Sequence, residues 1–151
     1  MKILHCCLAC FYIDDYSYQE NILPKFHKIQ GHDVKILAST ETYIDNKVLG
    51  NTVSGTYYNE DGIEVTRINY SKYLPLFLAK KIRKYIGIYQ YIDKYKPDVI
   101  FLHDCGFAGV FEIIKYCRKN KNVTVYADSH TDFINSANNL VSKYILHKII
   151  Y

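Results

Sequence analysis

The chain has 151 residues, of which 49% are hydrophobic and 23% charged, and its formal net charge is +4. This length suits one compact domain, and the composition excludes disordered and collagen-like proteins. Lys and Arg residues are scattered along the chain rather than gathered in one block, so nucleic-acid binding is not expected.

The sequence predicts a cytoplasmic protein. No apolar stretch approaches the roughly 20 residues that cross a bilayer, and the N-terminus lacks the small-residue cleavage site of a signal peptide. The five cysteines, an odd number, are expected to be reduced thiols rather than a disulfide framework.

A strand, a helix and a second strand are predicted at the N-terminus. Residues 2–8 form a nearly continuous apolar run, which is typical of a strand buried on both faces of a parallel sheet. The spacing of apolar residues predicts a helix over 17–30 that stops at Gly31, and residues 32–38 form the next strand. The apolar positions of this helix are Ile22, Leu23, Phe26 and Ile29.

The middle of the chain is predicted to leave the core and then return to it. Residues 40–61 are rich in turn-forming residues and predict an irregular excursion. Residues 63–68 alternate between apolar and polar, as a strand at a sheet edge does. Residues 75–95 carry apolar side chains at helical spacing and predict one long amphipathic helix, with Pro97 just past its end.

The last third repeats the alternation, with strands over 98–102 and 123–127 and helices over 106–119 and 135–151. We therefore expect an α/β fold with a Rossmann-like, doubly wound and mainly parallel sheet flanked by helices. The final helix keeps an apolar face up to Tyr151, so we expect a truncated chain whose last helix, or the strand ends near it, met another domain.

Polar and titratable side chains follow three of the predicted strands. In open α/β sheets, ligands bind beyond the carboxyl ends of the strands, where the direction of the crossovers reverses. Each side chain taken alone is explained equally well as a helix cap or turn residue, but their clustering favours a site. For His130 this setting favours a hydrogen-bonding or acid–base role over a packed core histidine. The residues are Asp14 and Asp15 after the first strand, His103 and Asp104 after the fourth, and Asp128, His130 and Asp132 after the fifth.

Three other kinds of site have weaker support in the sequence. No phosphate-binding glycine motif is present, which disfavours a dinucleotide oxidoreductase or a P-loop enzyme. Cys7 and Cys10 form a CxxC pair that Cys105 could approach, but no second pair exists, so packed thiols are favoured over a redox or zinc site. The basic run 80–84 is either a solvated helix face or a patch for peripheral contact with the inner face of an anionic membrane.

Taken together, six segments resemble the N-terminal half of a GT-B glycosyltransferase of family 4, the group often described as glycosyltransferase family 1 or capsular polysaccharide transferase. The likeness extends over nearly the whole chain, and the order and spacing of the segments carry it. The segments are residues 1–5, 18–27, 31–34, 61–65, 96–100 and 128–132.

This resemblance implies that residues 1–151 are the acceptor-side domain of a retaining, hexosyltransferase-type enzyme of polysaccharide biosynthesis. Such an enzyme moves a sugar from a nucleotide-sugar donor to a glycan or lipid-linked acceptor, without a cofactor or an obligatory metal. His130 matches a histidine that contacts the transferring sugar and is the catalytic candidate. The loop 12–19 would line the donor phosphates and the acceptor. The substrate-binding candidates are Asp14, Asp15, Tyr18, Gln19, His103, Asp104, Asp128 and Asp132.

The chain departs from that family in two respects. Its first loop lacks the paired glycines common in the family, and the C-terminal domain that would grip the nucleotide is absent. The domain is therefore expected to be inactive alone. The alternative function is a non-catalytic, Rossmann-like binding or interaction module, complete at 151 residues.

Overall fold

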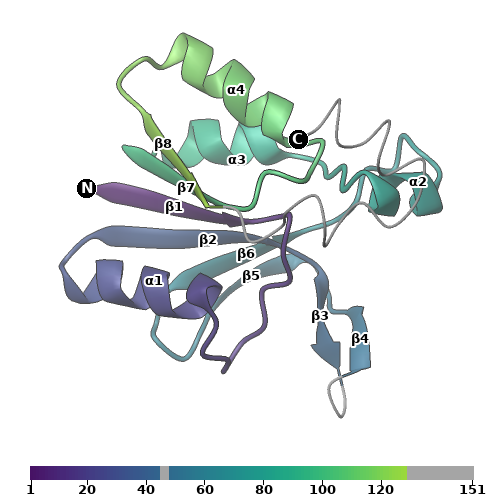
Figure 1. Cartoon of the computed structure of the whole chain (residues 1–151), viewed down its shortest axis with the longest axis horizontal. Helices are drawn as coiled ribbons and strands as arrows, with labels where there is room; N and C mark the ends of the chain where they lie inside the picture. The colour runs from purple at the N-terminus through teal and green to yellow at the C-terminus, as the bar shows by residue number, and fades with distance from the viewer. Residues whose placement is uncertain (45–47, 129–151) are drawn as a thin grey trace.

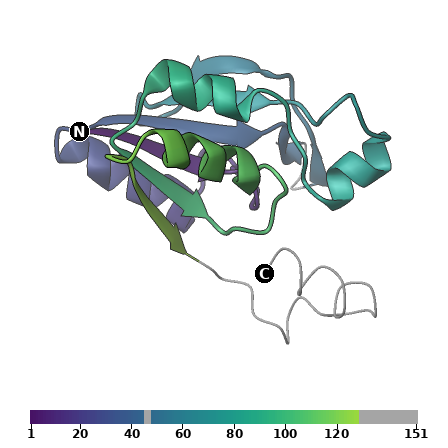
Figure 2. The ribbon, with the colours of Figure 1, turned by 90° about the horizontal axis from the view of Figure 1, so that it is seen from above.

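The computed structural model describes residues 1–44 and 48–128, which form a mixed α/β fold. A six-stranded sheet forms its centre, and α1 covers one face of this sheet while α3 and α4 cover the other (Figures 1 and 2). In spatial order its strands are β5 (Gly55–Tyr58), β6 (Glu64–Ile68), β2 (Asp33–Ser39), β1 (Lys2–Cys7), β7 (Val99–His103) and β8 (Thr124–Asp128). The helices are α1 (Gln19–Ile29), α2 (Leu76–Lys81), α3 (Ile88–Tyr95) and α4 (Val110–Lys119).

The predicted fold class, a Rossmann-like doubly wound sheet forming the N-terminal half of a GT-B fold, is wrong. The sheet is mixed, because β5 runs antiparallel to β6, and a separate antiparallel sheet is formed by β3 (Glu41–Ile44) and β4 (Val48–Asn51). The described residues contain only four short helices. The turn-rich residues thus form three strands rather than an irregular excursion, and the described part of the connection from β2 to β6 contains no crossover helix.

The strand predicted at a sheet edge lies inside the sheet. β6 pairs with β2 on one side and with β5 on the other, so β5 is the edge strand. The alternation that suggested an edge is still present, because Val65 and Arg67 are buried while Glu64 and Thr66 are half-buried on the opposite face. The alternation of polar and apolar residues in β6 therefore indicates that one face of the sheet is not covered by a helix. It does not indicate that β6 is an edge strand.

The predicted long helix over 75–95 is broken into α2 and α3. Between them, Arg83 and Gly87 have left-handed backbone angles, with φ of 50° and 82°. Tyr85 is buried there: its hydroxyl donates to the Leu8 carbonyl at 2.9 Å and its ring stacks on Tyr70 at 4.7 Å. These long-range contacts hold the segment in a non-helical path that its apolar spacing does not reveal.

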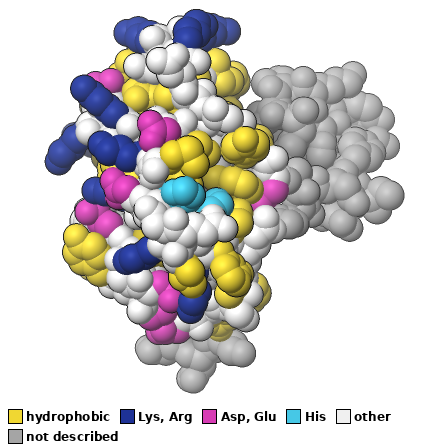
Figure 3. Space-filling model, turned by 90° about the vertical axis from the view of Figure 1, so that its left-hand side faces the viewer, with side chains coloured by type: hydrophobic (Ala, Val, Ile, Leu, Met, Phe, Trp, Pro, Cys, Tyr) yellow, Lys and Arg dark blue, Asp and Glu magenta, His cyan; other side chains and the backbone are white. Residues whose placement is uncertain are grey.

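Helix α1 buries Asn21 and Pro24 rather than its apolar stripe. Asn21 is buried and donates to the Ile13 carbonyl at 2.9 Å. By contrast Ile22, Phe26 and Ile29, the residues that defined the helix in the sequence, are exposed by 38%, 55% and 69%. Hydrophobic side chains also reach the surface among charges of both signs on the side where β1 and β2 begin (Figure 3).

The other elements agree with the sequence within a few residues. The predicted strands correspond to β1, β2, β7 and β8, and the helix predicted over 106–119 begins later, as α4. The helix predicted over 135–151 lies outside the described residues. Among the helices that the structure describes, none has the length and apolar character needed to cross a bilayer.

Replacing Gly87 distinguishes the broken helix from a continuous one. With φ at 82° and open space around its Cβ position, Gly87→Ala should destabilise the fold by about 1 kcal/mol through backbone strain alone. In a continuous helix the same change would stabilise by about 1 kcal/mol. Urea denaturation measures the change in unfolding free energy, and its sign distinguishes the broken helix from a continuous one. Gly31→Ala, with φ of 83° and equally open space, is the matched control and should also destabilise.

Candidate functional site

The carboxyl ends of five parallel strands meet at the right-hand edge of the sheet in Figure 1. The central strand β1 pairs with β2 on one side and with β7 on the other, so the chain leaves it in opposite directions in its two halves. The edge beyond such a strand is where ligands usually bind in open α/β sheets. Two groups of polar side chains reach this edge, one at the ends of β7 and β8 and the other at the ends of β2 and β6.

The first group begins with three histidines in contact, which we call the histidine chain: His27, His5 and His103. His5 Nε2 lies 3.0 Å from His27 Nδ1, and His5 Nδ1 lies 3.0 Å from His103 Nε2. His5 and His103 are buried in β1 and β7, whereas His27 lies half-buried on α1. The histidine chain thus links the helix to the interior of the sheet.

The electrostatics of the histidine chain keep its centre uncharged. Burial, followed by the neighbouring His103 and His27, lowers the pKa of His5 from 6.5 to about 2. Burial and the nearby His32 also lower the pKa of His27. A neutral imidazole has one donor and one acceptor nitrogen, so His5 can donate to one neighbour and accept from the other.

The histidine chain leads to Asp128 at the end of β8. His103 Nδ1 lies 3.4 Å from Asp128 Oδ2, which also accepts a hydrogen bond from the Gln19 side chain at 2.8 Å. The other oxygen, Asp128 Oδ1, accepts from the backbone N–H of Asp104 at 3.0 Å. Asp104 has a left-handed backbone, with φ of 70°, and its own side chain caps the following turn at Gly106. One carboxylate therefore connects the segments that follow β1 and β7.

The second group is centred on Arg67, whose side chain is almost wholly buried. Its guanidinium group donates to Asp14 Oδ2 at 3.0 Å, to the Tyr57 hydroxyl at 2.9 Å and to the Ser39 carbonyl at 3.0 Å. The Tyr57 hydroxyl in turn donates to Asp14 Oδ2 at 2.7 Å, and burial raises the pKa of Tyr57 above its usual value. The arrangement is a charged, hydrogen-bonded cluster with fixed geometry.

A cavity of about 390 Å³ opens beside this cluster. Asp14, Tyr57 and Arg67 line one part of it, and Thr42 and Tyr43 of β3 line another. Its volume falls in the range of roughly 300 to 1,000 Å³ that is typical of small-molecule sites. The lining combines a carboxylate, a cation and hydroxyl groups, which suits a ligand with several hydrogen-bonding groups.

The structure brings together four of the predicted site residues: Gln19, His103, Asp104 and Asp128. Asp14 belongs to the separate Arg67 cluster. Asp15 is exposed, and Tyr18 is exposed with its ring against Tyr16 at 5.2 Å. His130, the catalytic candidate, and Asp132 lie outside the described residues.

Several residues of these groups were missed by sequence reasoning. His5 and Arg67 lie within strands that were judged only by their apolar pattern, and Tyr57 lies in a segment expected to be irregular. For Arg67 a signal was present, because a charged residue occupies the same face of its strand as the buried Val65. His27 carried no comparable signal.

The cysteines give no support to a thiol site. Cys7 is fully buried, and burial together with a hydrogen bond to Cys10 raises its pKa well above the usual value, which disfavours a reactive thiolate. Within residues 1–44 and 48–128, no group of three or more His, Cys, Asp or Glu side chains is arranged to hold a metal ion.

Comparison of the chain with family models, with curated proteins and with solved structures gives no match.

Replacing His5 should change how stability depends on pH. His5 stays uncharged when folded, while its unfolded form takes up a proton below about pH 6.5, so its contribution is fully present above that pH and is lost as the pH falls toward 2. From about pH 7 to about pH 5, wild type should therefore lose about 2 kcal/mol more unfolding free energy than His5→Gln. Urea denaturation at both pH values measures this difference. Equal losses in wild type and His5→Gln would contradict the expectation.

Removing the charge of Asp14 should destabilise the fold through Arg67. Asp14→Asn leaves a buried guanidinium group without its carboxylate, and because the Asp14 side chain is 36% exposed we expect a loss of about 2 kcal/mol rather than the 3–5 of a fully buried pair. Asp61→Asn, which removes the partner of the exposed Lys25, should cost clearly less, because exposed ion pairs contribute little to stability. Denaturation near neutral pH compares the two, and similar losses would show that Arg67 does not depend on Asp14.

Proposed function

We propose that the chain is the acceptor-side domain of a retaining glycosyltransferase, and that it binds sugar ligands along the carboxyl edge of its sheet. The observation that carries the proposal is the position of the loop after β1. Asp14 of this loop is held by Arg67 on the β6 side, and Gln19 is held by Asp128 on the β8 side. The loop therefore lies across the point where ligands bind in open α/β sheets.

The chemistry of this edge suits a sugar. Sugar hydroxyls both donate and accept hydrogen bonds, and the edge offers the carboxylates of Asp14 and Asp128, the Tyr57 hydroxyl and the Gln19 amide. These groups are already held by neighbours, so little side-chain freedom is lost when a ligand binds. The cavity beside Asp14 has room for a ligand of this kind.

The proposal assigns binding, and not turnover, to the described residues. The resemblance places the catalytic histidine at His130, and it places the groups that grip the nucleotide in a second domain. We expect donor sugar and acceptor to react only when both domains are present, because the departing diphosphate needs positive charge or backbone N–H groups to stabilise it.

Ligand titration tests the proposal. The 151-residue chain, labelled with ¹⁵N, is titrated with a panel of nucleoside-diphosphate sugars and, separately, with neutral oligosaccharides. We expect saturable shifts of the backbone signals of Asp14, Gln19 and Asp104, and about tenfold weaker binding for Asp14→Asn.

The Asp61→Asn variant is the control and should bind as wild type does, since Asp61 pairs with Lys25 and does not line the cavity beside Asp14. Shifts confined to residues away from the loop after β1, or an equal loss of affinity in both variants, would overturn the proposed site. Sustained release of nucleoside diphosphate by the chain alone would contradict the need for a second domain.

A further inference from the structure

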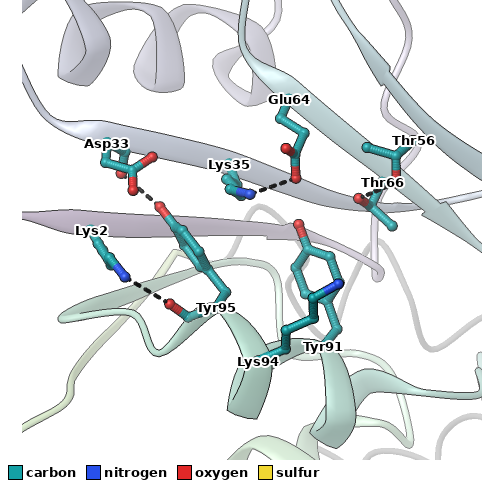
Figure 4. A pocket seen from close by; sticks show the side chains of 9 residues that line it. All are labelled: Lys2, Asp33, Lys35, Thr56, Glu64, Thr66, Tyr91, Lys94 and Tyr95. Atoms are coloured by element: carbon teal, nitrogen blue, oxygen red, sulfur yellow. Dashed lines mark hydrogen bonds and ion pairs between the residues drawn. The ribbon is translucent and has the colours of Figure 1, made fainter.

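A second polar groove lies on the opposite side of the sheet from α1. It exists because the connection from β2 to β6 forms strands rather than a crossover helix, so the face of β2, β6 and β5 next to α3 is uncovered. The groove has a volume of about 540 Å³. Figure 4 shows its floor on the three strands and its wall on α3. It is separate from the carboxyl-edge site, and no residue lines both cavities.

The floor of the groove is polar but internally paired. Lys35 and Glu64, on neighbouring strands, form an ion pair at 2.7 Å. The hydroxyls of Thr56 and Thr66 are 3.0 Å apart across β5 and β6. These groups satisfy one another, so the floor offers hydrogen-bonding atoms without an excess of charge.

Tyr95 makes the wall rigid at the end nearest β1. Its hydroxyl donates to the Asp33 carbonyl at 2.8 Å, which ties α3 to β2. The ammonium groups of Lys2 and Lys35 lie over its ring, 5.7 and 5.1 Å from the centroid. Lys2 also donates to the Tyr95 carbonyl at 3.3 Å. A wall held in this way is already in place before any ligand arrives.

Two groups on α3 keep unused binding capacity. Lys94 points into the groove (Figure 4), and among the described residues its ammonium group has no ion-pair partner. The Tyr91 hydroxyl is directed at Thr66 but is buried without a hydrogen bond of ordinary geometry. An unsatisfied buried polar atom destabilises a fold and calls for an explanation. The α3 wall of the groove therefore carries one cation without an ion-pair partner and one hydroxyl without a hydrogen bond.

We propose that this groove binds an anionic sugar, whose single carboxylate or phosphate pairs with Lys94 and whose hydroxyls bond to Tyr91, Thr56 and Thr66. Three lysines and two carboxylates line the groove, which leaves one positive charge in excess. The polar lining disfavours an apolar ligand, and the volume lies within the range of roughly 300 to 1,000 Å³ found for small-molecule sites. Because the groove is open along the sheet face, one unit of a longer acidic glycan would also fit.

Binding measurements on the full chain test this site. Isothermal titration compares a hexuronic acid disaccharide, a hexose 1-phosphate, a neutral hexose disaccharide and inorganic phosphate. We expect at least one of the two acidic sugars to bind, and the one that binds more tightly identifies the anionic group. The neutral disaccharide and inorganic phosphate should each bind about tenfold more weakly, since each lacks one of the two required features.

Two variants locate the binding. Lys94→Gln should weaken binding of the acidic sugar about tenfold, and Tyr91→Phe should weaken it while leaving the stability of the fold unchanged or raised, because it removes an unsatisfied hydroxyl. Lys81→Gln on α2 removes an equal charge outside the groove and should have no effect. Asp14→Asn should also leave this binding intact, which separates it from the carboxyl-edge proposal.

Several outcomes would overturn the inference. They are no saturable binding of either acidic sugar, equal binding of inorganic phosphate, equal effects of Lys94→Gln and Lys81→Gln, and an affinity that Tyr91→Phe leaves unchanged.

Discussion

The burial of His5 in the central strand constrains much of this structure. A buried imidazole needs hydrogen-bond partners for both of its nitrogens, because a buried polar atom without a partner destabilises the fold. It finds them in His27 and His103. His27 lies on the inward side of α1, whereas the apolar residues Phe26 and Ile29 of this helix lie at the surface. On the other side, His103 brings β7 into contact with Asp128 and so helps to organise the carboxyl edge.

The sequence was most informative where the signal is local. Strands such as β1 and β7 are nearly continuous apolar runs, which is the pattern of a strand buried on both faces. The sequence did not predict the local structure of segments whose conformation depends on contacts with residues far away in the chain. The apolar spacing of residues 75–95 is helical throughout, yet the helix is interrupted where the Tyr85 hydroxyl donates a hydrogen bond to the Leu8 carbonyl. In the same way, β5 becomes a strand only because β6 offers it an edge.

Part of the candidate site could be predicted from the sequence because that part also depends on local signals. Asp104 directly follows β7 and Asp128 ends β8, and the carboxyl ends of parallel strands meet at one edge whatever the details of the fold. Arg67 and Tyr57 lie on different strands, and they meet Asp14 only after the antiparallel pair has formed, so no spacing in the sequence joins them. The mixed sheet that contradicts the expected fold class therefore also creates the cluster beside the cavity, and it leaves bare the face that forms the second groove.

The hydrogen bond from Arg67 to the Ser39 carbonyl has a mechanical consequence. Ser39 is the last residue of β2, and the β3–β4 hairpin departs from the sheet immediately after it. The same guanidinium group holds the Tyr12 carbonyl and Asp14. It therefore acts as a stiff joint between the hairpin and the loop after β1, and neither can swing without straining a contact to the other.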